Sequence, residues 1–207
     1  MDDLAAVNGS AFGYRTDLGL FGGPPTTKGP APTVTLPPDG GAVGDSLPMA
    51  IAQYGPAVIL ESGLLTVSTE GAPCPGGSAT SAASVEDVGP GPFTAEEVSS
   101  TCTSTETGTT GSATVVNGRL VLSADPETGE PGETVEVPVD PEPGTEYEGE
   151  LAGVGDRFRI VFNEQVLGDG SITVNAVHMY FLGPVAVGDM VIAQSHSALT
   201  ASDDAAQ

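Results

Sequence analysis

The chain has 207 residues, of which 28 are acidic and only 5 basic, so its formal net charge at pH 7 is −23. Such a field repels phosphate, which excludes nucleic acid as a partner, and no apolar run is long enough for membrane insertion. Glycine (29) and proline (18) are frequent, but hydrophobic residues still make up 39% of the chain, which indicates folded strands joined by many turns. The length fits one domain over residues 1–207.

The N-terminal third predicts short strands separated by proline. Residues 10–21 alternate in part and indicate a strand, which a Gly-Gly-Pro-Pro run ends. Prolines surround residues 33–36, so we expect an edge strand or an extended connector there. Residues 57–60 and 64–67 are short apolar runs on either side of Glu61-Ser62-Gly63, as in a hairpin.

The middle of the chain is rich in small and β-branched residues. Residues 71–82 consist largely of Gly, Ala, Pro and Ser, and we expect a loop. Residues 83–88 and 95–105 predict strands. Thr94 and Glu97 match a helix capping box, but the Val, Ser and Thr residues that follow favour a strand over a short helix.

Asn117-Gly118 is the clearest local signal, because it lies between the apolar runs 113–116 and 119–122. The pair predicts a two-residue type I′ hairpin, in which both central residues need a positive φ. Residues 125–150 follow, with ten acidic residues, five prolines and no basic residue. We expect this acidic segment to be extended on the surface, with one edge strand at 133–139.

The last third carries the strongest core pattern. Phe158, Ile160 and Phe162 share one face at period two. In the strand predicted at 171–182, one face carries Ile172, Val174, Ala176, His178, Tyr180 and Leu182, and the other carries Thr173, Asn175, Val177, Met179 and Phe181. Because both faces are partly apolar, we expect a central strand covered on both sides. Residues 189–196 predict a final strand, and residues 201–207 a frayed tail.

These ten or eleven strands predict an all-β fold, an antiparallel β-sandwich with long Gly/Pro-rich loops. No helix longer than two turns is supported.

Short motifs along the chain carry a likeness to a known family. They are Ser10–Gly13, Pro32–Pro37, Ala83–Val85, Ser100–Cys102, Val161–Gln165, Ile172–His178 and Gly188–His196. Together they resemble the choice-of-anchor P family of actinobacterial surface proteins. The resemblance implies a secreted protein, from a family whose members attach to the cell envelope by varied C-terminal anchors. It implies no catalytic activity.

Compartment and disulfide bonding are linked questions. The chain opens Met1-Asp2-Asp3, which has the wrong charge for the start of a signal peptide. It is either the mature form of a secreted protein or a cytosolic protein, and we expect the first. Cys74 and Cys102 are the only cysteines, and a bridge between them would stabilise the fold by roughly 3–4 kcal/mol. The alternative is two reduced, buried thiols.

Candidate catalytic and metal-binding residues are few. His178 and His196 are the only histidines, no GxSxG motif is present, and we interpret both as structural strand residues rather than members of a catalytic triad. The zero tryptophan count disfavours a glycosidase. Asp125–Glu133 and Asp169 offer oxygen ligands without matching an EF-hand, so a structural Ca²⁺ stays open, and no other cofactor is expected.

Two functions remain. The first is a secreted cell-surface structural or adhesive protein that assembles into a filament or layer by exchanging the strand at 10–21, within the separable segment 1–23, between subunits. The same strand pairing within its own sheet is the alternative to exchange. The second function is an extracellular glycan- or Ca²⁺-binding module. We do not expect an enzyme.

Overall fold

A computed structural model describes residues 6–73, 76–125, 127–151 and 153–200. Every regular element in these ranges is a β-strand, which confirms the predicted all-β class. The strands are β1 (Ala6–Leu20), β2 (Thr26–Thr35), β3 (Gly41–Leu47), β4 (Ala50–Tyr54), β5 (Ala57–Ser62), β6 (Leu65–Ala72), β7 (Ser78–Val88), β8 (Phe93–Thr105), β9 (Gly108–Val116), β10 (Arg119–Val121), β11 (Thr134–Glu136), β12 (Thr145–Glu150), β13 (Arg157–Gly168), β14 (Ser171–Leu182) and β15 (Ala186–Thr200). No described segment forms a helix that could cross a membrane.

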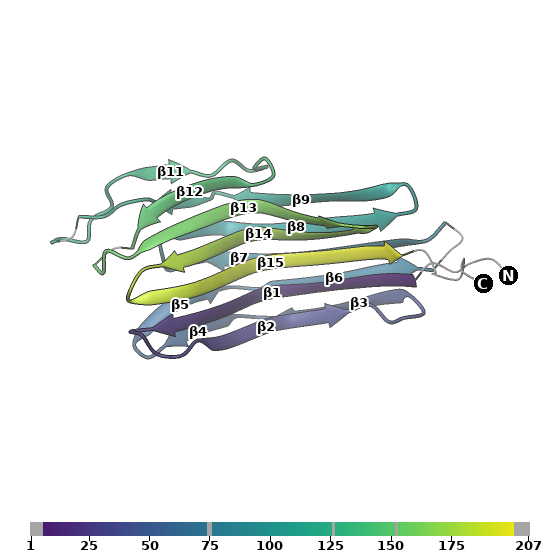
Figure 1. The fold of residues 1–207 in the computed structure, drawn as a ribbon, viewed down its shortest axis with the longest axis horizontal. Coiled ribbons are helices and arrows are strands. Elements are labelled where there is room, and N and C mark those ends of the chain that lie inside the picture. The colour runs from purple at the N-terminus through teal and green to yellow at the C-terminus, as the bar shows by residue number, and fades with distance from the viewer. Residues whose placement is uncertain (1–5, 74–75, 126, 152, 201–207) are drawn as a thin grey trace.

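The strands form two antiparallel sheets packed face to face (Figure 1). The first sheet has six strands in the order β12-β13-β14-β15-β1-β2, and the second has the order β11-β10-β8-β7-β6-β3, with β9 also paired to β8. A two-stranded ribbon, β4–β5, lies at one end of the sandwich. The start of β1 and the end of β15 pair at the opposite end.

The N-terminal strand lies inside its own sheet in this structure. β1 pairs antiparallel with β15 from Ala6 to Leu20, and its other edge pairs with β2. It starts earlier than the expected residue 10 because the alternation of buried and exposed side chains already begins at its first residues. β2 is the edge strand predicted around residues 33–36, and it includes Pro30 and Pro32, each after a cis peptide bond.

The predicted hairpin around Glu61-Ser62-Gly63 is wrong. β5 pairs with β4, whereas β6 pairs with β3 and β7, so the two apolar runs belong to different sheets. Residues 61–63, which connect β5 to β6, instead form hydrogen bonds with the end of β7: the Gly63 N–H donates to the Glu86 carbonyl at 2.8 Å, and Glu61 forms a bridge with Gly89. These main-chain bonds take the place of the bonds that a hairpin between β5 and β6 would make.

The Asn117-Gly118 hairpin is also wrong. β9 and β10 both pair with β8, one after the other along the same edge, and not with each other. Only Asn117 has a positive φ (51°), whereas a type I′ turn needs two such residues. Asn117 donates to the Glu96 carboxylate at 2.6 Å, and the Gly118 carbonyl accepts from Val137 N–H at 2.9 Å. Asn117-Gly118 is thus a kink between β9 and β10, which lie one after the other along the same edge of β8.

Small residues, which predicted a loop over 71–82, form strand instead over most of that range. β6 runs to Ala72 and β7 starts at Ser78, and the alternative of a short helix near Thr94 is wrong because β8 begins at Phe93. Ala79 and Ser81 are buried between the sheets. A Cβ at Gly9 would overlap the Thr69 side chain on the facing sheet, so the sheets approach too closely there for larger residues.

The acidic segment follows its prediction in part. β11 is the edge strand expected within 133–139, but it is only three residues long, and a second edge strand, β12, was not predicted. Glu146, Glu148 and Glu150 alternate along β12 with less exposed neighbours. The predicted tail, residues 201–207, and the first five residues of segment 1–23 lie outside the described residues.

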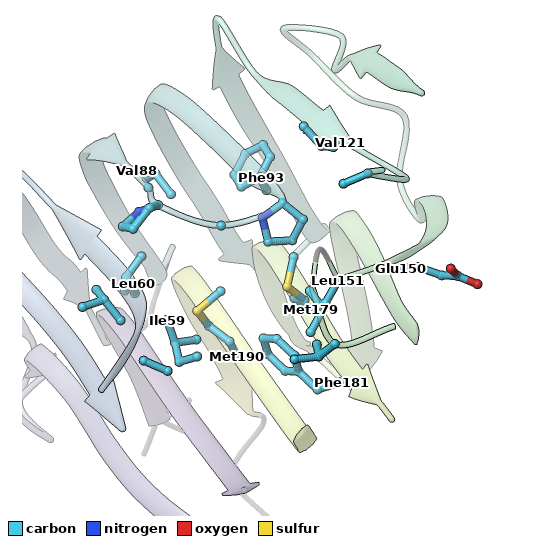
Figure 2. A pocket seen from close by; sticks show the side chains of 18 of the residues that line it. Ile59, Leu60, Val88, Phe93, Val121, Glu150, Leu151, Met179, Phe181 and Met190 are labelled. Carbon is cyan, nitrogen blue, oxygen red and sulfur yellow. The ribbon is translucent and has the colours of Figure 1, made fainter. Parts of the chain in front are cut away.

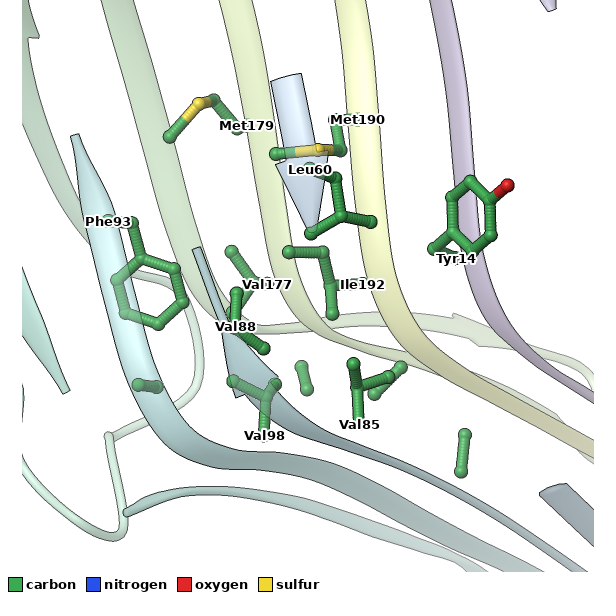
Figure 3. Packing of buried hydrophobic residues seen from close by; sticks show 14 of the residues in the cluster. Tyr14, Leu60, Val85, Val88, Phe93, Val98, Val177, Met179, Met190 and Ile192 are labelled. Atoms are coloured by element: carbon green, nitrogen blue, oxygen red, sulfur yellow. The ribbon is translucent and has the colours of Figure 1, made fainter. Parts of the chain in front are cut away.

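Large apolar side chains pack between the two sheets around Leu60 of β5 (Figure 3). Phe158, Ile160 and Phe162 are fully buried, which confirms the period-two pattern of β13. The Phe93 ring meets the Phe162 ring edge-on, with ring centres 5.3 Å apart. Val85 and Val98 of the second sheet face Ile192 of the first.

One row of residues across the first sheet reverses which side chains point inward. Gly13, Asn163, Ala176 and Ala193 form this row, named here the inversion row, and each is followed or preceded by a second buried residue in the same strand. The strand ladders skip this row while keeping their register on both sides of it. Asn163 (φ 51°) and Ala193 (φ 53°) are left-handed there, and left-handed residues break the two-residue alternation.

The face assignment of β14 is therefore right only up to Ala176. Beyond it, Val177, Met179 and Phe181 point into the sandwich, and His178 and Tyr180 point outward. The apolar residues on both predicted faces thus enter one core, and no second layer of the described chain covers the outer face of the first sheet.

The left-handed conformation of Ala193 gives a stability prediction. An alanine in this conformation costs about 1–2 kcal/mol, and glycine removes that cost. We expect Ala193→Gly to leave the free energy of unfolding within about 0.5 kcal/mol of wild type, because the relief offsets the lost methyl burial. Ala176→Gly, in the same row without a positive φ, should lose about 1.5–2 kcal/mol. Urea unfolding measures both, and equal losses would contradict the role of Ala193.

Candidate functional site

A cluster of polar side chains lies on the outer face of the first sheet, where it spans the inversion row. It comprises Glu164 of β13, His178 and Tyr180 of β14, and Asp189 of β15, and is called the outer polar cluster below. Neighbouring antiparallel strands bring these residues together, since His178 pairs with Val191 and Tyr180 with Asp189. The sequence separates Glu164 from Asp189 by 25 positions, so only the sheet register could reveal the cluster.

The histidine sits between two carboxylates. His178 Nδ1 lies 2.6 Å from Glu164 Oε2, and His178 Nε2 lies 3.1 Å from Asp189 Oδ2. An imidazole donates to both neighbours at once only when it is protonated. The Tyr180 hydroxyl donates to Glu164 Oε1 at 2.9 Å, and its ring stacks on the imidazole with centres 4.0 Å apart.

Further polar residues extend the cluster on both sides. Arg15 of β1 reaches Asp189 Oδ2 at 3.3 Å, and the Arg159 guanidinium lies 4.4 Å from the centre of the Tyr180 ring. Asn175 donates to Glu164 Oε2 at 2.7 Å, and Gln194 donates to the Asn175 side-chain oxygen at 2.6 Å. Arg15 and Arg159, two of the five basic residues, therefore contact this cluster.

These contacts shift two pKa values in opposite directions. The hydrogen bond from His178 lowers the pKa of Glu164 to about 2, against the opposing effect of burial. Burial, followed by the hydrogen bond to Glu164, raises the pKa of Tyr180 to about 12. Glu164 is therefore ionised and Tyr180 neutral across the physiological range, which fixes the direction of their hydrogen bond.

The cluster does not form a nucleophilic triad. Such a triad needs a serine or cysteine against the imidazole, whereas both nitrogens of His178 face carboxylates. His196, on the same face, contacts the Thr173 hydroxyl through Nδ1 at 2.9 Å, and burial lowers its pKa. The neighbouring Ser195 and Ser197 are buried on the inner side of the strand, as the alternation predicts.

The predicted Cys74–Cys102 disulfide is not formed in the structure. Cys102 is a free, buried thiol of β8, and Cys74 lies outside the described residues. The Cys102 side chain points between the sheets toward Ser195 and Ser197 of β15, and burial raises the pKa of its thiol. The described partners of this thiol are serine hydroxyls of the facing sheet, not a second sulfur.

In the acidic loop Asp125–Glu133, which the sequence offered as a Ca²⁺ site, the Asp125 carboxylate is hydrogen-bonded to the backbone of the loop itself. Asp125 Oδ1 accepts the N–H groups of Glu127 (2.8 Å) and Thr128 (2.9 Å), and these bonds lower the pKa of Asp125. Asp169 is exposed in the turn between β13 and β14, far along the chain from that loop. Among the described residues, no three His, Cys, Asp or Glu side chains are grouped as a metal ion requires.

A second feature is an apolar cavity of about 430 Å³ between the sheets, at the end where β5 lies (Figure 2). Met179, Phe181 and Met190 of the first sheet form its floor, and Ile59 and Phe93 face them. The pattern of apolar and polar residues does not predict this cavity. Two Gly-Pro pairs at residues 89–92, which form one wall, are its one sequence signal. The methionines of the floor point inward because of the inversion row, which only the structure shows.

Comparison with known proteins adds no relative: no family model, no curated protein and no solved structure matches this chain.

The shifted carboxylate predicts a pH-dependent contribution to stability. Because the pKa of Glu164 is lower in the folded chain than its ordinary 4.5, its contribution is complete above pH 4.5 and is lost as the pH falls toward 2. We expect Glu164→Gln to cost about 1–3 kcal/mol at pH 6 and much less at pH 2.5. Urea unfolding at both pH values measures the gap.

The matched control is Glu70→Gln, at an exposed position of β6 in the other sheet. It should change the free energy of unfolding by less than about 0.5 kcal/mol at either pH. A Glu164→Gln penalty of the same size at pH 6 and pH 2.5 would contradict a role for the Glu164 charge.

Proposed function

We propose that this protein is a secreted cell-surface protein with a structural or adhesive role, and that copies associate by exchanging strand β1. The observation that carries the proposal is how β1 is connected. It is the first described strand, it fills a slot between β15 and β2, and one short turn joins it to the strands that follow. A strand that a short hinge joins to the rest of its sheet can occupy the same slot in a neighbouring copy.

The hinge itself supports exchange. Phe21 has a φ of 53° and is 79% exposed, and Gly22 follows with a φ of 73°. A left-handed conformation is costly for a bulky side chain, so the closed turn stores a cost that an extended hinge would release. Pro24 and Pro25 come next in the chain, and proline favours an extended connection.

The edges of the first sheet favour exchange over simple edge-to-edge addition. Pro30 and Pro32 interrupt the donors of β2, and Glu146, Glu148 and Glu150 put like charges along β12. Prolines and charges are the usual means by which sheet edges resist pairing with another chain. An exchanged β1 avoids both edges because it enters the interior of the sheet.

A non-catalytic role agrees with the outer polar cluster. Glu164, His178 and Tyr180 spend their hydrogen-bonding groups on one another, so they hold the strands of this face together rather than await a substrate. The resemblance to the choice-of-anchor P family supports secretion. The free thiol of Cys102 gives no support to an oxidising compartment.

The turn offers a direct test of assembly. We expect the wild-type protein to form oligomers or filaments as its concentration rises, seen by light scattering after size exclusion and by electron microscopy. Phe21→Gly removes the cost of the closed turn, about 1–2 kcal/mol, and should reduce the exchanged fraction at least fivefold. Wild-type protein that stays monomeric at every concentration would reject self-assembly.

Phe21→Ala is the matched control, because it removes the exposed ring and keeps a Cβ in the left-handed turn. We expect Phe21→Ala to stay oligomeric. Equal loss of oligomers in both variants would show that the exposed ring, and not the turn, drives association.

The alternative, a glycan- or Ca²⁺-binding module, makes a different prediction. Extracellular Ca²⁺ modules bind in the range of about 0.1–1 mM, so about 5 mM Ca²⁺ would raise the melting temperature of such a protein by several degrees. Because the Asp125 carboxylate already accepts two backbone N–H groups, we expect no such rise here. Binding on a glycan array would likewise favour the alternative. A rise with Ca²⁺ but not with Mg²⁺ would favour the alternative.

A further inference from the structure

We propose that the apolar cavity at the β5 end of the sandwich binds a small, uncharged apolar molecule, such as a medium-chain alcohol or a molecule of similar size. The cavity volume of about 430 Å³ lies in the range of natural ligand sites, which is about 300–1,000 Å³. It is a site distinct from the outer polar cluster, which faces away from the interior of the sandwich.

The cavity reaches into the core and is not a shallow surface groove. Leu60, Met179 and Ile192 line it although almost none of their surface is exposed to solvent. The rim is different: Val58 is 37% exposed and Val154 is 49% exposed, so apolar surface continues outward to the mouth. A ligand would cover this apolar surface. It would also fill the cavity, and an empty cavity in a closely packed interior destabilises the fold.

The walls offer few groups that could hydrogen-bond to a polar ligand. Pro90 and Pro92 have no N–H, the Gly89 N–H donates to the Glu61 carbonyl at 2.9 Å, and the Pro92 carbonyl accepts from Val121 N–H at 2.7 Å. The backbone of this wall is thus occupied by the sandwich itself. Sugars and extended peptides need such groups, so the wall favours a ligand with an apolar body.

Charge excludes acidic ligands. Glu150 is the only charged side chain among the described residues that line the cavity, and it lies at the rim with its carboxylate directed away from the apolar side chains (Figure 2). The described lining residues include no lysine or arginine, and the whole chain carries a net charge of −23. The carboxylate of a fatty acid would therefore lack a partner and meet a repulsive field.

Two features of the chain suit the cavity to a bound molecule. Met179 and Met190 contribute flexible, polarisable side chains that adapt to ligands of different shape. Val154 at the mouth lies two residues before Asp156, which anchors this part of the chain. The Asp156 Oδ2 atom accepts the N–H groups of Val185 (2.9 Å) and Ala186 (2.6 Å). The first and last described residues, Ala6 and Thr200, pair at the opposite end of the sandwich (Figure 1).

The test compares decanol with decanoate, which share a chain length and differ in charge. At pH 8 we expect decanol, at about 100 times its dissociation constant, to raise the melting temperature by about 5–10 °C. Isothermal titration should show at least tenfold weaker binding of decanoate. No effect of decanol would overturn the proposal, and equal affinities would overturn its charge selectivity.

Val154→Trp locates the site, because a large side chain at the exposed rim closes the mouth without entering the core. We expect at least a tenfold loss of decanol affinity. The matched control is Val166→Trp, at a position that is 58% exposed and outside the cavity lining, which should bind decanol as wild type does. Unchanged affinity in Val154→Trp, with an unchanged fold by circular dichroism, would place any binding elsewhere and overturn the assignment.

Discussion

The inversion row is the constraint on which the first sheet depends. A strand normally sends successive side chains to opposite faces, and a change of phase moves every later residue to the other face. In this sheet Gly13, Asn163, Ala176 and Ala193 change phase together, so four neighbouring strands keep their pairing while exchanging inner and outer residues. If only one strand changed phase, its polar residues would enter the core beside the apolar residues of its neighbours.

The same row creates both candidate sites. Beyond it, His178 and Tyr180 point outward, where Asp189 meets them from the next strand and Glu164 from the other side of the row. Met179 and Phe181 point inward, where they form the cavity floor. Toward the chain ends, the inner face carries small residues and the sheets approach closely. Large residues occupy the inner face at the other end. The cavity is the part of the space between the sheets that these side chains leave empty.

Periodicity predicted those elements whose side chains alternate without interruption. Phe158, Ile160 and Phe162 lie on the inner face before the row, so their period of two was sufficient. The same rule failed for His178, because a left-handed Asn163 or Ala193 leaves no mark in a pattern of apolar and polar residues. Asn117-Gly118 misled for a related reason: a local turn preference could not reveal that β8 offers one continuous edge to both flanking strands.

The row also limits what an exchanged β1 could do. A side chain at residue 13 would lie 2.6 Å from the Leu65 side chain and 2.9 Å from the Ala31 carbonyl, so only glycine fits where β1 crosses the row. A shift of β1 by one or two residues would bring Ala11, Phe12, Tyr14 or Arg15 to that point in place of Gly13. An incoming strand from another copy would therefore have to enter in the native register, with Gly13 beside Ala193. Strand exchange under this constraint favours ordered pairing of identical copies and disfavours the irregular edge association that leads to aggregation.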